Sequence, residues 1–388
     1  MVKGLKNCIP TCLLAVLATA LCLGIVFFAL HQVPLSKAAD PRYPKNKKNQ
    51  NFEQIPVVKA IAENWWESRQ PIYFNIPARI LIKHQGDKQA AQDIINAAWK
   101  EFERIGRIFN PYDPESEVAK LNQAGTSGTI SISGDLYKTL KISQQLFAES
   151  RGRFDPTFLP IKKLWRHAET TQIIPTEREI LKTLQDTGFE NVVIDTGHTG
   201  QIRITKPAIR FDFGGIAKGY AVDQVRKILK QSGIAHGLVQ LGGEIAAFGG
   251  NDGEPWRIGI QHPRKMPDIW GIIGRRADTR VSTSGNYRQP LRIQGQTFYH
   301  IFSPKTGKPV SERVLGVTTI GGAESHSNAL IDGAATAITI MGAAEGIQFA
   351  EKLGIEALIL TRKNGPGIAE HMTPGFDRFY ERKNKPAK

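Results

Sequence analysis

The chain has 388 residues, of which 41% are hydrophobic, a formal net charge of +15 and three cysteines. This length and apolar content suffice for one large domain or two medium ones, which excludes disorder as the default. The first 60 residues hold eight Lys/Arg against two Asp/Glu, so six of the positive charges lie outside the predicted fold. The remaining charges are thinly spread without a cluster of basic and aromatic residues, which argues against a nucleic-acid groove.

The amino-terminal segment 1–38 is predicted to be a signal peptide or a membrane anchor. Lys3 and Lys6 precede an almost wholly apolar run, Cys8 to Leu30, that is long enough to span a bilayer. Ser36-Lys37-Ala38 also offers small residues for a signal peptidase, so cleavage and retention both stay open. The two lysines favour an inside amino terminus, which places the bulk of the chain across the membrane. All three cysteines lie in this segment, so the folded part has no disulfide and no cysteine metal site.

Residues 39–70 are polar and basic and are predicted to be a linker, with the folded domain at 71–388. In chain order, the first half predicts a strand at 78–83, a helix at 88–109, a strand at 129–133, a helix at 135–150 and a hairpin at 189–205. The second half predicts strands at 237–245, 256–261, 270–273, 280–283, 296–302 and 314–320, helices at 328–341 and 344–353, and a strand at 356–360. Antiparallel hairpins with irregularly placed helices indicate an α+β fold with mixed, largely antiparallel sheets.

The stretch from Ile209 to Lys230 joins a predicted short strand, a Gly214-Gly215 turn and a helix that carries Lys218. Glycine has no Cβ, so such a turn can bring backbone close to a ligand, and the helix start offers N–H groups to an anion. The alternative is an ordinary strand-to-helix connection that uses glycine for packing.

Asp332 and Thr336 are four residues apart near the start of an alanine-rich helix, so their oxygens point from one face. This pair could begin a site for Mg²⁺, which prefers oxygen ligands. The alternative is that Asp332 caps the helix. His300 closes a strand before the turn Ser303 to Pro309, where it could take a proton from a hydroxyl or simply end the strand with a hydrogen bond.

Two loops add further candidates. Tyr112 lies in a loop between helices, where it could stack on a ring system or cover the core. Asp155 begins a loop after a helix, either as a cap or as a ligand contact.

Taken together, these segments resemble the ApbE family, the FAD:protein FMN transferases. The resemblance runs from about Ile72 to Phe376 and rests on motifs that occur in the family's order. They are NPYDPESEVAKLN (110–122), GRFDPT (152–157), FDFGGIAKGYAVD (211–223), LVQLGGEI (238–245) with STSGNY (282–287), and HIFSPKTGKPV (300–310) leading to IDGAATAITIMG (331–342).

The resemblance implies a T-fold-like protein with two lobes around an FAD cleft. It implies Mg²⁺-dependent transfer of FMN from FAD to a Thr or Ser hydroxyl of a partner protein, with release of AMP. The implied metal ligands are Asp332, Thr336 and the Gly215 carbonyl, and the implied catalytic residue is His300. The implied FAD contacts are Tyr112, Arg153, Phe154, Asp155, Asp212, Lys218 and Phe302.

The chain departs from the family pattern at three places. Ser303 stands where the family usually has Asp, and Ala335 stands where some members carry a second acid. The usual Met-Gly-Thr near the first strand is not recognisable in IYFNIPARI (72–80), which leaves that FAD contact unassigned.

The implied partner is a flavin-accepting domain of a membrane or periplasmic redox protein, which fits an exported chain that is periplasmic or anchored to the outer face of the inner membrane. Two alternatives stay open. One is a Mg²⁺-dependent FAD pyrophosphatase, in which water replaces the protein hydroxyl. The other is a non-enzymatic periplasmic flavin-binding assembly factor.

Overall fold

A computed structural model describes residues 57–73, 75–124, 128–195, 197–198, 200–285, 290–310, 313–322 and 325–383. The predicted signal or anchor segment 1–38 lies outside these ranges, as do Asn286 and Tyr287 of the STSGNY motif. Within the ranges, no helix has both the length and the apolar character that a membrane span requires.

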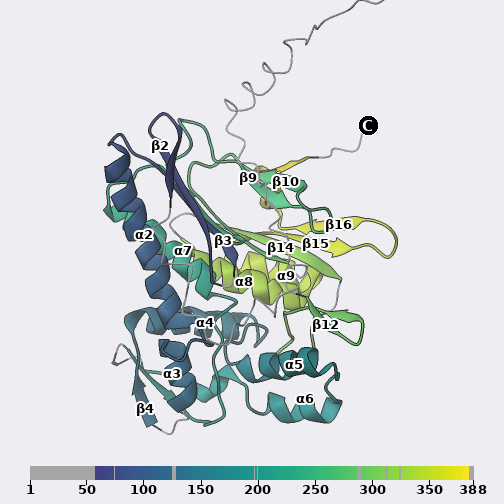
Figure 1. Cartoon of the computed structure of the whole chain (residues 1–388). Helices are drawn as coiled ribbons and strands as arrows, with labels where there is room; N and C mark the ends of the chain where they lie inside the picture. Colours follow the sequence, from purple (N-terminus) through teal and green to yellow (C-terminus); the bar gives the residue numbers. More distant parts are fainter. Residues whose placement is uncertain are drawn as a thin grey trace, which may run out of the picture.

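The part of the chain that the structure describes contains one large sheet of nine strands, each antiparallel to its neighbours (Figure 1). In sheet order the strands are β1 (Val58–Ala62), β2 (Trp65–Ile72), β3 (Ile76–Lys83), β7 (Gly237–Leu241), β8 (Glu244–Phe248), β11 (Thr279–Gly285), β14 (Val314–Gly321), β15 (Glu356–Arg362) and β16 (Ile368–Met372). The single strand predicted at 237–245 is in fact two, because Gly242 adopts a φ of 63° and turns the chain back.

The linker prediction for 39–70 is wrong from Val58 onward, because β1 and most of β2 lie there and belong to the main sheet. Trp65 is buried, and the indole of Trp99 donates to the Ser68 hydroxyl at 3.1 Å, which ties β2 to the first long helix. In β1 only Val58 is buried, and β2 buries Trp65, Ser68 and Ile72, so neither strand shows the apolar alternation that marks a strand.

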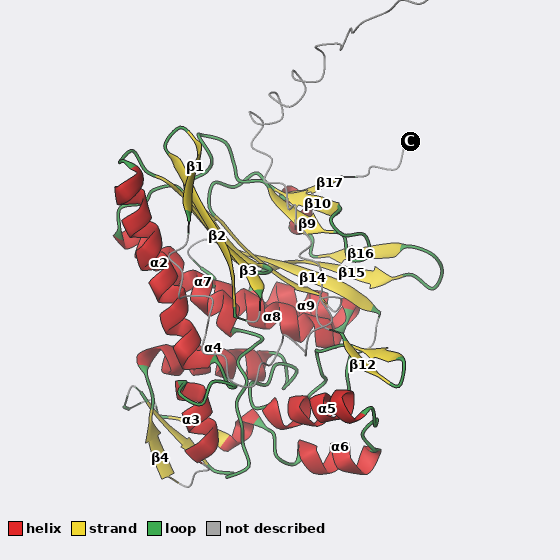
Figure 2. Ribbon diagram, viewed as in Figure 1, coloured by secondary structure: helices red, strands yellow, loops and turns green. Residues whose placement is uncertain are grey.

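One face of the sheet is covered by a layer of helices, which Figure 2 shows below the strands. These helices are α2 (Lys88–Phe109), α7 (Ala217–Gln231), α8 (Asn328–Met341) and α9 (Ala343–Leu353). The predicted helices at 88–109 and 328–341 have the same bounds in the structure. Large apolar side chains such as Phe102, Phe211 and Phe248 form the main core in this layer.

The opposite face carries a small sheet of β9 (Ile258–Gln261), β10 (Ile269–Ile273) and β17 (Tyr380–Arg382). The turn η3 (Phe376–Arg378) precedes β17. Trp65 and Trp256 meet edge to face in the second core, with ring centroids 5.7 Å apart. Both faces of the central strands are therefore buried, which explains their nearly continuous apolar sequences.

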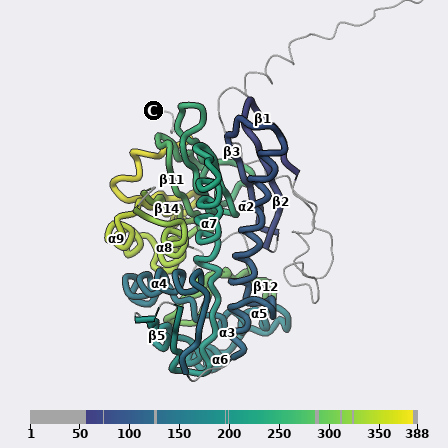
Figure 3. Tube along the Cα trace, turned by 90° about the vertical axis from the view of Figure 1, so that its left-hand side faces the viewer, coloured from purple at the N-terminus to yellow at the C-terminus, as the bar shows by residue number. Residues whose placement is uncertain are grey.

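A second lobe lies below the helix layer in Figure 1 and also in the view turned by 90° in Figure 3. It contains α3 (Glu117–Ala124), α4 (Gly134–Glu149), α5 (Leu159–Thr171), α6 (Glu177–Leu184), η2 (Phe189–Asn191), and the strands β4 (Gly128–Ser131), β5 (Val192–Ile194), β6 (Gln201–Ile204), β12 (Leu291–Ile293) and β13 (Gln296–Phe298). The predicted hairpin is confirmed as β5 and β6. The predicted α+β class with largely antiparallel sheets is also confirmed.

Three helices of this lobe, α3, α5 and α6, were not predicted from the sequence. In α6 the buried set consists of Ile180 alone, and the helix is held at its start by a capping box between Thr176 and Glu179. A helix with one buried residue carries no apolar periodicity, so only its cap could have revealed it.

Candidate active site

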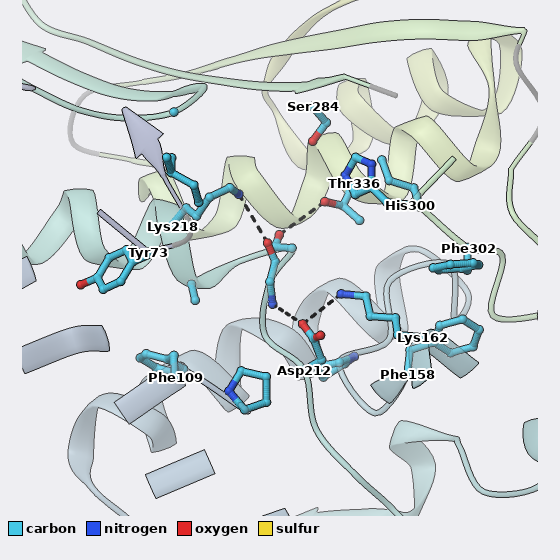
Figure 4. Close-up of a pocket in the computed structure, with 18 of the residues that line it drawn as sticks. Tyr73, Phe109, Phe158, Lys162, Asp212, Lys218, Ser284, His300, Phe302 and Thr336 are labelled. Atoms are coloured by element: carbon cyan, nitrogen blue, oxygen red, sulfur yellow. Dashed lines mark hydrogen bonds and ion pairs between the residues drawn. The ribbon is translucent and has the colours of Figure 1, made fainter. Parts of the chain in front are cut away.

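A cavity of about 380 Å³ lies between the helix layer and the lower lobe. In Figure 4, Tyr73 and Phe109 lie at one end of it and Phe158 and Phe302 at the other. Polar side chains, with Asp212, Lys218 and Thr336 among them, lie between these aromatic ends. The cavity therefore has two aromatic ends and a charged middle.

The approach to the Gly214-Gly215 turn is an extended segment in place of the predicted strand at 209–213. There the side chain of Asn122 takes the role of a partner strand: its Nδ2 donates to the Phe211 carbonyl at 2.9 Å, and the Phe211 N–H donates to its Oδ1 at 2.6 Å. The part of the predicted strand that forms is an isolated bridge between Arg210 and Phe158. Phe211 and Phe213 are buried and stacked, which fixes where the turn begins.

The Gly214-Gly215 turn lines the middle of the cavity with backbone. The Gly215 carbonyl accepts from Thr336 Oγ1 at 3.4 Å, and the Gly214 carbonyl accepts from Lys218 Nζ at 3.4 Å. A Cβ on Gly215 would lie 3.1 Å from Thr336 Oγ1. The turn therefore presents backbone oxygens at the cavity, and the close contact with Thr336 also leaves little room for a side chain at position 215.

Gly219, a different glycine in the same motif, allows α7 and α8 to pack closely. A Cβ there would lie 2.3 Å from the backbone oxygen of Asn328, so α7 and α8 can meet at this distance only with glycine. The close approach lets the Gly219 N–H donate to Asp332 Oδ2 at 3.0 Å.

Asp332 is not the helix cap. α8 begins at Asn328, and its cap is Ser327, whose hydroxyl accepts from the Leu330 N–H at 3.0 Å. Asp332 lies one turn further on, where it is fully buried and held by Gly219. The interpretation of Asp332 as a helix cap is therefore excluded. A buried carboxylate that does not cap a helix needs a charge partner.

That partner is Lys218, whose ammonium lies 3.2 Å from both carboxylate oxygens of Asp332 and 3.3 Å from Glu244 Oε1. Burial disfavours the charged lysine, but the two carboxylates outweigh it and raise the pKa of Lys218 above its ordinary value. Two buried carboxylates around one ammonium leave the group with a net negative charge. Glu244 was missed as a site residue, although it stands in the LVQLGGEI motif directly after the paired glycines.

The structure brings two of the three predicted metal ligands, Thr336 and the Gly215 carbonyl, into contact at the cavity, whereas the third, Asp332, is fully buried and is not among the residues that line the cavity. Thr336 lies one turn after Asp332 on α8, and its Oγ1 is 3.4 Å from the Gly215 carbonyl oxygen. Among the described residues, His, Cys, Asp and Glu form no group of three that could hold a metal ion. A carboxylate, a hydroxyl and a carbonyl are nevertheless the hard oxygen donors that suit Mg²⁺, with open positions left for phosphate. The donor set fits the implied metal.

Asp212 anchors the turn from the other side. Its Oδ1 accepts from the Gly214 N–H at 2.7 Å and lies 3.0 Å from Lys162 Nζ. Burial alone would raise the pKa of Asp212, but the Lys162 ammonium and the Gly214 N–H hold that pKa below its ordinary value. Lys162 lies on α5, which the sequence analysis did not predict, so this cation was missed.

The remaining predicted FAD contacts line the same cavity. The Arg166 guanidinium lies over the Tyr112 ring, 4.8 Å from its centroid. Arg153 pairs with Glu345 at 2.9 Å, while Phe154 packs beside Gly215. Tyr112 and Arg153 thus contribute large planar groups to the lining of the cavity.

Asp155 also lines the cavity, but its hydrogen bonds are local. Oδ1 accepts from the N–H and hydroxyl of Thr157 at 2.7 and 2.6 Å, and Oδ2 accepts from the Phe189 N–H at 3.3 Å. Burial, the largest effect, raises the pKa of this carboxyl above its ordinary value. The side chain therefore shapes the loop from which Phe154 reaches the cavity.

His300 and Phe302 line the cavity from the segment after β13. The predicted turn follows: the N–H groups of Thr306 and Gly307 donate to the Ser303 carbonyl, and Gly307 has a φ of 64°. At position 303 the backbone closes the turn, so a serine suffices there. Ala335, the other departure, is fully buried in α8.

Tyr73 is a cavity residue that the sequence analysis left unassigned, in the place of the missing Met-Gly-Thr. It turns the chain between β2 and β3 with a φ of 44°. Its ring lies on Gly106 of α2, where a Cβ would be 2.2 Å from a ring carbon. A glycine inside an otherwise amphipathic helix was the one signal for this contact.

Comparisons with known proteins show which family the chain resembles in sequence and fold. The model of the ApbE family matches residues 74–359. An FAD:protein FMN transferase of Vibrio cholerae serotype O1 is 31% identical over 280 residues, which cover 71% of this chain and 81% of that protein. The solved structure of the flavin transferase ApbE from Vibrio cholerae has a TM-score of 0.69 at 27% identity, and the match covers 81% of this chain and 99% of that chain. The ApbE protein of Thermotoga maritima gives a TM-score of 0.71 at 27% identity with the same coverage.

Proposed function

The chain belongs to the ApbE family and is an FAD:protein FMN transferase; we propose the details of its reaction. In this proposal, FMN moves from FAD to a Thr or Ser hydroxyl of a partner protein. The reaction depends on Mg²⁺ and releases AMP. The observation that carries this proposal is the layout of the cavity. FAD has two ring systems joined by a diphosphate, and the cavity has two aromatic ends joined by a charged and oxygen-rich middle.

The middle of the cavity fits the diphosphate. Asp332, Thr336 and the Gly215 carbonyl would hold Mg²⁺, which supplies electrostatic stabilisation of the charge that develops on the phosphates. Lys162 and Lys218 add two ammonium groups on either side of the Gly214-Gly215 turn. The turn itself keeps side chains out of the space that the phosphates need.

In the transfer, the hydroxyl oxygen of the acceptor forms a bond to the phosphorus of the FMN half. The bond between that phosphorus and the bridging oxygen breaks, and AMP leaves with the bridging oxygen. His300, which lines the cavity beside Phe302, is the candidate to take the proton from the hydroxyl. Figure 4 shows it on the same side of the cavity as Thr336, so this candidate proton acceptor lies near the proposed metal site.

The partner and the location follow from the amino terminus. A signal peptide or anchor at 1–38 would place the enzyme in the periplasm or on the outer face of the inner membrane. The acceptor is then a flavin-binding domain of a membrane or periplasmic redox protein.

The direct test incubates the purified full chain with FAD, Mg²⁺ and an acceptor domain, with mass spectrometry of the acceptor. We expect addition of FMN, and none on an acceptor whose receiving Thr is replaced by Ala. An unmodified acceptor alongside free FMN and AMP would overturn the proposal and favour the pyrophosphatase. An unmodified acceptor without FMN or AMP would favour the non-enzymatic alternative.

Metal removal gives a second test. We expect EDTA to abolish transfer while the circular dichroism spectrum is unchanged, because three apolar cores hold the fold. Added Mg²⁺ should restore activity. Loss of the folded spectrum on chelation would show that the metal is structural.

A further inference from the structure

The ammonium of Lys218 is shared between two carboxylates that come from different elements. Asp332 lies on α8 and Glu244 begins β8, and both side chains are 1% exposed. Lys218 Nζ lies 3.2 Å from Asp332 Oδ2 and 3.3 Å from Glu244 Oε1. The lysine therefore has one carboxylate that belongs to the proposed metal ligands and one that does not.

This arrangement creates a competition for Asp332. Oδ2 of Asp332 is already fixed by the Gly219 N–H, and the ammonium lies against both oxygens. A divalent cation bound to the same buried carboxylate would repel the ammonium strongly, because the surroundings screen charge poorly. Lys218 has to leave Asp332 when a metal arrives.

We propose that Glu244 is the residue that receives the Lys218 ammonium when a metal ion takes Asp332. The inference rests on the proposed metal site. A lysine has a flexible four-carbon stem, so a small rotation keeps the ammonium on Glu244 while it leaves Asp332. The ammonium never becomes a buried charge without a partner, which would be costly. Glu244 is a positioning residue that makes metal entry favourable without contacting the metal.

The surroundings of Glu244 support this role. Its Oε1 also accepts from the Ser282 hydroxyl at 3.4 Å, so β8 and β11 hold the carboxylate in place. Thr336 donates to the Gly215 carbonyl on the α8 side of Lys218. Lys218 thus lies between Asp332 and Glu244 as a movable charge.

The test is a double-mutant cycle on metal affinity, measured on the full chain without FAD by titration calorimetry with Mg²⁺ and by Mn²⁺ spin resonance. In Glu244→Gln the ammonium keeps only Asp332, so the metal Kd should rise about tenfold. In Lys218→Met the competitor is gone, so the Kd should fall below that of the wild type. The double variant should bind at least as tightly as the wild type, because no ammonium remains to compete.

Other outcomes would overturn the inference. A double variant as weak as Glu244→Gln would make Glu244 a metal ligand, and weaker binding by Lys218→Met would show that the lysine assists the metal. A wild type that binds no metal would remove the proposed metal site as well. Circular dichroism checks folding, and Lys218→Gln, which also removes the ammonium and should likewise lower the Kd, replaces Lys218→Met if that variant does not fold.

A matched pair controls for net charge. Lys83 and Asp252 form an ion pair outside the cavity lining, so Lys83→Met and Asp252→Asn make the same charge changes elsewhere. We expect both to leave the metal Kd unchanged. Equal shifts in the two pairs would attribute the effect to overall charge and overturn the inference.

Discussion

The two sides of the cavity are built in different ways. On the α7–α8 side, backbone atoms set the positions: Gly219 brings the helices together, and its N–H fixes the buried Asp332. On the α5 side, side chains meet side chains, as Lys162 does with Asp212 and Arg166 with Tyr112. A position set by backbone contact tolerates little change, whereas a wall of long side chains can adjust. Substitutions on the first side should therefore have the larger effects.

The largest effect should come from Asp332→Asn. The amide oxygen can still accept from Gly219, so the fold should persist, but the charge of the proposed metal ligand is lost. We expect transfer to fall by about 10³-fold, on the order found when a key electrostatic contact to the transition state is removed. Transfer assays and circular dichroism measure the two halves of this prediction. Activity within tenfold of the wild type would mean that the α7–α8 side does not hold the metal.

A pair of glycine variants separates packing from ligand contact. Gly219→Ala places a Cβ against the α8 backbone and should destabilise the protein by about 3 kcal/mol. Gly215→Val places its Cβ beside the Thr336 hydroxyl, which can move, so it should reduce transfer more than stability, by roughly 10²-fold. Urea unfolding and transfer assays on both variants decide the matter. If Gly215→Val unfolds before it loses activity, the turn serves packing.

The same difference explains what could be predicted from the sequence. On the α7–α8 side, glycine is required where two backbone segments approach closely, and the buried charged residues must stand at fixed positions. These requirements produce short recognisable motifs such as FDFGGIAKGYAVD. The sequence therefore pointed to Gly215, Asp332 and Thr336 as candidates, and in the structure Thr336 contacts the Gly215 carbonyl while Asp332 contacts Lys218. Whether Asp332 capped the helix could not be decided, because both roles place an acid near a helix start.

On the α5 side, the sequence pointed to Tyr112 and Asp212, but the cations of α5 itself were missed, for a physical reason. Lys162 and Arg166 lie one turn apart on a helix that faces the cavity. Either lysine or arginine can place a positive charge there, so the positions carry no distinctive sequence pattern. Tyr73 depends on a turn and on a helix that is near only in space. Edge strands such as β1 escaped because their pairing uses backbone groups, which every sequence has.

A smaller effect should follow from Arg166→Met on the adjustable side. Its guanidinium lies over the Tyr112 ring in the cavity wall, so its loss should weaken FAD binding by roughly threefold to tenfold with little change in kcat. Flavin fluorescence titration and the KM for FAD measure this. Arg178→Met on α6 is the control, since Arg178 is exposed and outside the cavity lining. A loss as large as that of Asp332→Asn would show that both sides are equally rigid.

The smallest effect concerns the acid stability of the pair of Lys162 and Asp212. The lysine and the Gly214 N–H hold the pKa of Asp212 below its ordinary value of 3.8. A lowered carboxyl pKa contributes stability that is fully present above the unfolded pKa and is lost as the pH falls through the folded pKa. Lys162→Met should therefore lower the free energy of unfolding by about 2 kcal/mol between pH 5 and 7, and by progressively less below about pH 4. Urea unfolding from pH 3 to 7 measures the difference, and a difference that stays constant over the whole range would show that Lys162 acts through packing. Because the ammonium is itself partly exposed, the fold should survive its loss, in contrast to the loss of Gly219 on the opposite side.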